Sequence, residues 1–214
     1  MKITTKLTAV FLIAGLCTAC SKQLPADTRD RLCLAGNRLD TAGTGITPDL
    51  LAKSCTDSLL LPGTTDKGKK GTYNTDMTQT TALSREYIFE GKALYTKTVD
   101  IPESWAGTSV RLIMERTKPT TLWIDGKEVG TNDDISTAQQ YDLSAFLSPG
   151  THTIAIAVDN GKRAVPEKVY GSSHAYSGST QTNWNGIIGD FYLESAPLCG
   201  IETYSFIPTW RKSL

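Results

Sequence analysis

The chain has 214 residues and equal numbers of basic and acidic side chains, 22 of each, so its formal net charge at pH 7 is zero. The densest basic stretch, residues 67–70, holds only three lysines around a glycine, which argues against a nucleic-acid partner. The 18 glycines, nine prolines and short apolar segments argue against long helices. We therefore expect one domain built from strands.

The N-terminus has the pattern of a bacterial lipoprotein signal. Lys2 and Lys6 precede an apolar run over residues 7–16, which is too short to span a membrane, and the sequence CTAC follows. We predict a signal peptide over residues 1–19 and a lipid attached to Cys20. An ordinary cleaved signal, in which Cys20 has no special role, remains the alternative. Removing the two signal lysines from the 22 basic residues leaves a mature net charge near −2.

The predicted location is the cell envelope. Ser21 follows Cys20 with no acidic run behind it, which favours the outer membrane, with the protein facing the periplasm. Cys33, Cys55 and Cys199 would then lie in an oxidising compartment, where three cysteines form one disulfide at most. Pairing of Cys33 with Cys55 is one option, and the sequence leaves the pairing open.

Residues 20–49 are polar and glycine-rich with little alternation, which predicts a tether and lead-in segment. Residues 50–197 form the predicted compact domain, and residues 198–214 an irregular tail. Within the domain, β-branched and aromatic residues recur at period two, the spacing of strands. The clearest such segments are REYIFEG (85–91), LYTKTVDIP (94–102), SVRLIME (109–115), TLWIDGKEVG (121–130), HTIAIAVDNG (152–161) and GIIGDFYLES (186–195).

A tight hairpin is predicted at Asp125 and Gly126. This pair stands between apolar residues of alternating pattern and supplies the positive φ angles of a two-residue turn. In the segment 152–161, Ile154, Ile156 and Val158 are expected to share one face. Strands separated by frequent turns, with no convincing helix, predict an all-β fold of two packed antiparallel sheets, a β-sandwich.

The sequence offers weak candidates for catalysis and for a metal. Asp133 and Asp134 are adjacent, so on an extended chain their carboxyl groups point apart and do not suit a glycosidase pair. A solvated turn or a single ligand contact is favoured, and a calcium site there would rest on composition alone. The two histidines, His152 and His174, are far apart, and no G-x-S-x-G motif is present. We predict no catalytic residue, metal or cofactor.

The best candidate binding site is the loop that begins at residue 171, which carries no charge before Asp190. An aromatic face can stack on the C–H face of a sugar while amides and hydroxyls bind its hydroxyl groups, so a neutral glycan is the predicted ligand. In the alternative, the Trp plugs the end of the sandwich and the amides hold the loop by binding its backbone. The candidate ligand-binding residues are His174, Tyr176, Gln181, Asn183 and Trp184.

An ordered series of motifs resembles the N-terminal sugar-binding domain of family 2 glycoside hydrolases, the β-galactosidase-like and β-glucuronidase-like enzymes. The resemblance covers about residues 58–196. Its motifs are LPGTTD (61–66), GKALYTKTVDIPESWAG (91–107), RTKPTTLWIDGKEVGTNDD (116–134), YDLSAFLSPGTHTIAIAVDNG (141–161) and STQTNWNGIIGDFYLE (179–194). The resemblance implies a galactose-binding-like jelly roll. It also implies substrate contacts by Gln181, Asn183 and Trp184, to which His174 and Tyr176 are added by position.

In enzymes of this family, an immunoglobulin-like domain and a (β/α) barrel with both catalytic glutamates follow the sugar-binding domain. The resemblance therefore implies a carbohydrate-binding accessory domain of a glycoside hydrolase, truncated before those domains and inactive alone. We interpret residues 198–214 as a frameshifted tail, because a shifted frame over IPTWRKSL (207–214) can encode a segment resembling Tyr-Pro-Asp-Val. The alternatives are a genuine short protein that binds glycans as a lipoprotein, and a docking module for a separately encoded catalytic barrel. Which sugar is bound stays open.

Overall fold

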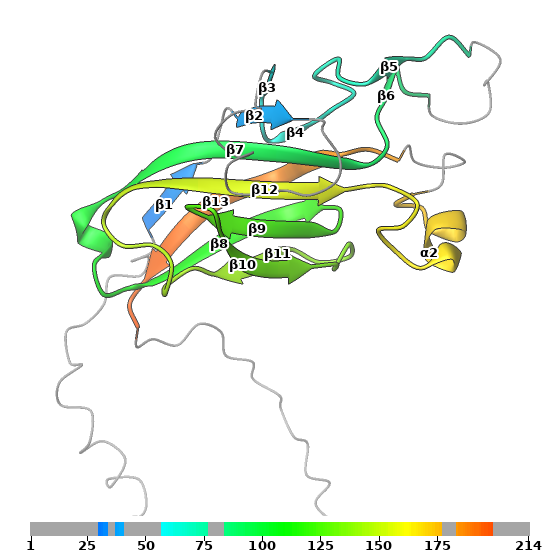
Figure 1. The fold of residues 1–214 in the computed structure, drawn as a ribbon. Helices are drawn as coiled ribbons and strands as arrows, with labels where there is room; N and C mark the ends of the chain where they lie inside the picture. The colour runs from blue at the N-terminus through cyan, green and yellow to red at the C-terminus, as the bar shows by residue number, and fades with distance from the viewer. Residues whose placement is uncertain (1–29, 34–36, 41–56, 77–83, 177–182, 199–214) are drawn as a thin grey trace, which may run out of the picture.

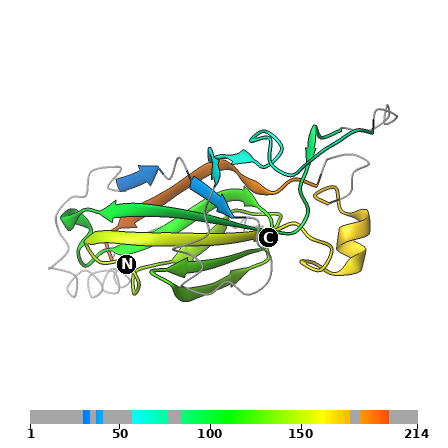
Figure 2. The same cartoon turned by 45° about the horizontal axis from the view of Figure 1, so that its top comes forward.

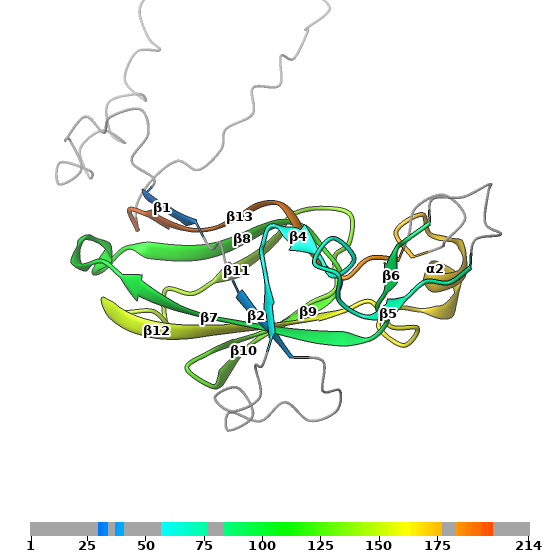
Figure 3. The same ribbon diagram turned by 90° about the horizontal axis from the view of Figure 1, so that it is seen from above.

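A computed structural model of the chain describes residues 30–33, 37–40, 57–76, 84–176 and 183–198. Antiparallel strands form two facing sheets, which Figure 3 shows as two layers. The predicted all-β sandwich is therefore confirmed. Helical structure in the described part is short: a 3-10 turn, η1 (Glu103–Trp105), and one helix of under two turns, α2 (Glu167–Ser172).

The first sheet has the order β1-β13-β8-β11, with β4 also paired to β13. Its strands are β1 (Asp30–Cys33), β4 (Gly63–Thr64), β8 (Ser109–Thr117), β11 (Gln139–Asp142) and β13 (Gly186–Ala196). The second sheet has the order β10-β9-β12-β7-β2-β3. Its strands are β2 (Asn37–Asp40), β3 (Asp57–Leu59), β7 (Lys92–Ile101), β9 (Thr120–Ile124), β10 (Lys127–Asn132) and β12 (Gly150–Asp159).

A separate two-stranded arm joins β5 (Thr72–Tyr73) to β6 (Tyr87–Ile88). Figures 1 and 2 show this arm and α2 at the same end of the sandwich, the end at which β12 finishes and β7 starts. We call this end the loop end.

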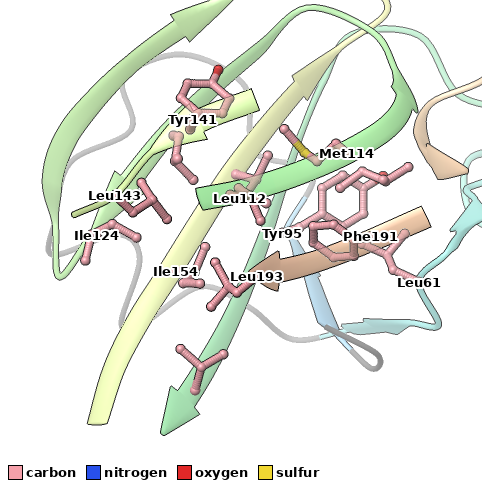
Figure 4. Packing of buried hydrophobic residues seen from close by; sticks show 14 of the residues in the cluster. Leu61, Tyr95, Leu112, Met114, Ile124, Tyr141, Leu143, Ile154, Phe191 and Leu193 are labelled. Carbon is pink, nitrogen blue, oxygen red and sulfur yellow. The ribbon is translucent and has the colours of Figure 1, made fainter. Parts of the chain in front are cut away.

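The core lies between the two sheets, and the strand periodicity explains how it forms. Ile154, Ile156 and Val158 of β12 point inward, as predicted, and each is at most 2% exposed. They meet the inward residues of β8 and β13 on the facing sheet, as Figure 4 shows for part of the cluster. Burying each such side chain contributes about 1.5–3 kcal/mol, so this apolar layer is the main favourable term for the fold.

The hairpin at Asp125 and Gly126 is confirmed. Both residues have positive φ, 50° and 80°, and Lys127 pairs directly with Ile124 across the turn. The Asp125 carboxylate accepts hydrogen bonds from the Thr153 amide (2.7 Å) and from His152 Nδ1 (2.6 Å). Partial burial raises the pKa of Asp125, but the hydrogen bonds from Thr153 and His152 lower it, and the net change is downward. The turn is therefore held by a charged carboxylate.

Two short strands lie within residues 20–49, where a tether and lead-in segment was expected. β1 pairs with β13, and β2 pairs with β7 and β3. Each has only four residues, so its alternation is too brief to stand out in a polar sequence. Their backbone pairing extends both sheets beyond the segments that the pattern marked.

Candidate functional site

Three buried asparagines organise the loop end: Asn160, which follows β12, and Asn183 and Asn185, which precede β13. Asn160 Nδ2 donates to the Phe89 carbonyl (2.9 Å), and its Oδ1 accepts the Gly91 amide (2.9 Å). Asn183 Nδ2 donates to the Asn160 carbonyl (2.8 Å). These side chains satisfy backbone groups that the strands leave unpaired where they end, which fixes the loops against each other.

Asn185 connects this network to both sheets. Its Nδ2 donates to the carbonyls of Val158 (2.9 Å) and Gly91 (3.1 Å), and its Oδ1 accepts the Tyr95 hydroxyl (2.8 Å). Its backbone carbonyl accepts the Thr65 amide (2.9 Å). Asn185 is fully buried, so water cannot take the place of these hydrogen bonds. Loss of the side chain would leave several buried polar atoms without a partner.

Gly186 allows the loop to approach β4 at this point. Its φ is +142°, and a Cβ built there would lie 2.2 Å from the Gly63 carbonyl oxygen. Only glycine fits so close to another backbone. The start of β13 is thereby placed directly against β4.

A buried lysine lies under the candidate loop. Lys118, in the turn between β8 and β9, is fully buried, and its Nζ donates to the Ala175 carbonyl. The ammonium also lies 4.3 Å from the Tyr176 ring centroid and 4.7 Å from that of Trp184. Burial, and secondarily the charge of Arg85, lower the pKa of Lys118 to about 8. Two aromatic faces and one carbonyl thus stabilise a cation that burial disfavours.

Arg85 joins the β5–β6 arm to the same loop. Its guanidinium donates to the Asn183 carbonyl and lies 4.0 Å from the Glu90 carboxylate. Partial burial lowers the pKa of Arg85 from its usual value, although nearby carboxylates oppose that change. The loop that looks neutral in the sequence therefore packs against two cations from distant segments.

Tyr176 completes the cluster from the side of α2. Its ring lies 5.5 Å from that of Tyr170, at an interplanar angle of 45°. Its hydroxyl is buried, has no hydrogen-bond partner in the described ranges, and has a pKa raised chiefly by burial. Tyr170 is half-buried, so the pair runs from the interior to the surface.

The structure brings three of the five predicted ligand residues into one cluster. Asn183 and Tyr176 are buried, Trp184 is half-buried, and His174 is exposed one residue before the carbonyl that Lys118 binds. Gln181 lies outside the described residues. The amide of Asn183 binds backbone, as the alternative interpretation expected, so the surface open to a ligand centres on Trp184 and His174. That these residues contact sugar stays a prediction.

Sequence reasoning missed Arg85, Lys118 and Asn160. Arg85 and Lys118 stand far along the chain from the loop, and nothing in the local pattern marks either as buried. Asn160 sits in the Asp-Asn-Gly turn after β12, which predicts a turn but not a partner.

The other sequence candidates have structural partners. Asp134 accepts four hydrogen bonds from the amides and hydroxyls of Ser136 and Thr137, which lower its pKa strongly. His152 lies between the Asp125 carboxylate and the Ser148 carbonyl, 2.6 and 2.8 Å away. Across the described ranges, no three His, Cys, Asp or Glu residues gather in a way that could hold a metal ion. No described helix is long and apolar enough to cross a membrane.

Comparison with known proteins places this geometry in a family. Residues 57–190 match the family described as "Glycosyl hydrolases family 2, sugar binding domain". A β-galactosidase of Arthrobacter sp. (strain B7) is 25% identical over 124 residues, which are 56% of this chain and 11% of that protein. A β-galactosidase of Priestia megaterium is 28% identical over 114 residues, 52% of this chain and 10% of that protein. The chain thus matches about a tenth of the length of these relatives.

Solved structures share the fold. A calcium-binding mutant of β-glucuronidase 2 from Bacteroides uniformis superposes with a TM-score of 0.56 at 23% identity, covering 79% of this chain and 18% of that one. At this identity the likeness shows the arrangement of the two sheets and carries no residue roles.

Proposed function

Because the chain belongs to family 2 of the glycosyl hydrolases through its sugar-binding domain, we propose that its loop end contacts a neutral glycan or glycoside. The observation that carries the proposal is the position of Trp184. The indole is half-buried, with the Lys118 ammonium 4.7 Å from its ring centroid, and it stands in the loop at the end of the sandwich. A fixed aromatic face is suited to stacking on a sugar ring, because little entropy is lost when it binds.

We further propose that the domain serves as an accessory to a glycosidase catalytic domain and does not hydrolyse glycosides alone. The relatives named β-galactosidase are about ten times longer than the matched segment, which supports a division of labour between binding and catalysis. Galactosides are therefore the first probes to use. The loop end would form one wall of a pocket whose acid and nucleophile come from the catalytic domain.

Replacing Trp184 with alanine is expected to weaken the binding of methyl β-D-galactopyranoside at least about tenfold, because the stacking surface is lost. Binding is measured by NMR titration of residues 20–214 with methyl β-D-galactopyranoside and methyl β-D-glucopyranoside, read at the His174 amide of the loop end. Trp184→Phe, which keeps an aromatic face, should bind with intermediate strength.

The matched control is Phe146→Ala. Phe146 is a half-buried aromatic beneath Lys127, 5.1 Å from its ammonium, in the loop between β11 and β12 and therefore at the other end of β12. This variant should bind like the parent. Folded Trp184→Ala that binds as tightly as the parent, or a parent that binds no galactoside or glucoside, would contradict the proposal.

The lipid anchor at Cys20 is also proposed, with the sequence pattern as its support. Cys20→Ser is expected to abolish incorporation of labelled fatty acid and to release the protein from the outer-membrane fraction, because the acylated sulfur is lost. The measurement is palmitate labelling with membrane fractionation, and Cys33→Ser is the control. Labelling that survives Cys20→Ser would show that the lipid is attached to another residue, and a parent protein that takes up no label would show that there is no lipid anchor.

A further inference from the structure

A hollow of about 170 Å³ lies on the outer face of the six-stranded sheet, near the loop end. β7, β9, β10 and β12 contribute to its lining, and Figure 1 shows these strands side by side. We call it the β9–β12 hollow and define it by Lys92, Thr121, Thr131, Asp133, Ala157 and Asp159. The hollow has room for several water molecules, and therefore for a small ligand such as one sugar ring.

The strand register explains why the sheet is concave here. Ala157 of β12 pairs with Thr121 of β9 on one side and with Leu94 of β7 on the other, and Thr121 pairs with Thr131 of β10. Cross-strand partners project on the same face, so one row across the sheet reads Thr131, Thr121, Ala157, Leu94. Ala157, the shortest side chain of this row, is only 1% exposed and lies at the floor of the hollow.

The next row supplies charge at the rim. Asp159, two residues beyond Ala157 on the same face, pairs directly with Lys92 of β7. Asp133 follows the last residue of β10 and contributes a second carboxylate. Within the described part of the chain, the side chains of Lys92, Asp133, Thr121 and Thr131 form no hydrogen bond to other residues. Lys92, Thr131 and Asp133 are also exposed, so their polar atoms can reach a ligand.

The walls are fixed by bonds that do not use those atoms. The Asp159 amide donates to the Pro119 carbonyl (2.9 Å), and Asp159 Oδ1 accepts the Gly161 amide (2.8 Å). On the other side, Gln139 Nε2 donates to the carbonyls of Asn132 (3.3 Å) and Asp134 (2.7 Å), which holds the turn that carries Asp133. A site whose walls are already ordered loses little entropy on binding.

From this arrangement we propose that the β9–β12 hollow binds one neutral pyranose residue of a glycan. Carboxylates accept hydrogen bonds from sugar hydroxyls, the Lys92 ammonium donates, and the threonine hydroxyls can do either. Pro119 and Ala164 offer apolar contact to the C–H groups of the ring. One lysine against two carboxylates gives the lining a net negative charge, so the hollow disfavours acidic sugars.

This site is separate from the one proposed above. In the turn from β8 to β9, Lys118 is buried against Tyr176 and Trp184, whereas the next residue, Pro119, lines the hollow on the outer face. The inference therefore does not depend on sugar binding by the loop end. A glycan held in the hollow would extend across the outer face of the sheet.

The test is an amide and methyl NMR titration of residues 20–214 with methyl β-D-galactopyranoside, methyl β-D-glucopyranoside and methyl β-D-glucuronide. At least one neutral glycoside is expected to shift Thr121, Thr131 and Ala157 with millimolar affinity, and the glucuronide should bind at least about tenfold more weakly. Ala157→Leu fills the hollow and should abolish the shifts. Thr121→Val removes one hydroxyl without changing shape and should weaken binding about threefold to tenfold.

Thr98→Val is the control, since Thr98 is exposed on β7, outside the residues that line the hollow, and this variant should bind like the parent. The inference is overturned if no neutral glycoside shifts these residues, if the glucuronide binds equally well, or if folded Ala157→Leu keeps the shifts. If Ala157→Leu fails to fold, the two single variants Thr121→Val and Asp133→Asn decide instead. Unchanged binding by both of them overturns the inference. Trp184→Ala should leave the shifts at the hollow unchanged, so the proposal for the hollow and the proposal for the loop end can be contradicted independently.

Discussion

Replacing Asn185 with alanine is expected to lower the free energy of unfolding by about 2–4 kcal/mol. The change leaves the Tyr95 hydroxyl and the Val158 carbonyl buried without the partner they have in the parent, at about 1–3 kcal/mol for each stranded group. It also frees the segment before β13 from β7 and β12, so Trp184 loses part of its support. The measurement is urea denaturation followed by circular dichroism.

The control for this variant is Asn74→Ala. Asn74 is a half-buried asparagine of the β5–β6 arm, and its side chain donates to the Arg85 carbonyl (2.9 Å) and accepts the Asp76 amide (3.0 Å). Water can replace these bonds, so a loss below about 1 kcal/mol is expected. Equal losses for the two variants would show that Asn185 is an ordinary polar contact and does not organise the loop end.

Lys118 is expected to make stability rise with pH in the alkaline range. Its pKa in the folded protein is about 8, below the ordinary value of 10.5, so between these values the unfolded chain holds a proton that the folded chain has released. Stability is therefore lowest below pH 8 and recovers as the pH rises. From pH 7 to pH 9.5 the recovery amounts to about 2 kcal/mol, and Lys118→Met, which carries no titrating group, should lack it.

The comparison is the difference in unfolding free energy between the parent and Lys118→Met, measured by urea denaturation at several pH values from 6.5 to 9.5. Lys127→Met is the control, because Lys127 lies over Phe146 in the same kind of contact but is exposed. The difference should change with pH more for Lys118→Met than for this control. A flat curve for Lys118→Met would mean that Lys118 keeps its proton in the folded protein throughout this range.

The strands could be predicted because their information is local. The alternation of Ile154, Ile156 and Val158, and the positive φ angles required by Asp125 and Gly126, depend on neighbours in the sequence, and both predictions are confirmed. The short strands β1 and β2 were not predicted, because four residues are too few to show a period-two pattern. They form because longer strands offer them an edge to pair with.

The candidate site could be predicted only in part, because its contacts are long-range. The aromatic and amide residues stood together in one loop, and the structure keeps Tyr176, Asn183 and Trp184 in one cluster. The cations below them come from a turn and an arm far along the chain, and only the packing of the sheets brings Lys118 and Arg85 there. Burial also changed the role of Asn183, whose amide group binds backbone.

Carbohydrate binding by the loop end is tested most directly by an NMR titration of residues 20–214 with methyl β-D-galactopyranoside and methyl β-D-glucopyranoside, read at that end. A neutral glycoside is expected to shift the Trp184 indole N–H and the His174 amide in a saturable way. No saturable shift is expected at the opposite end of the sandwich, around Phe146. If neither glycoside shifts Trp184 or His174 in the folded protein, the proposal that the loop end contacts carbohydrate is contradicted.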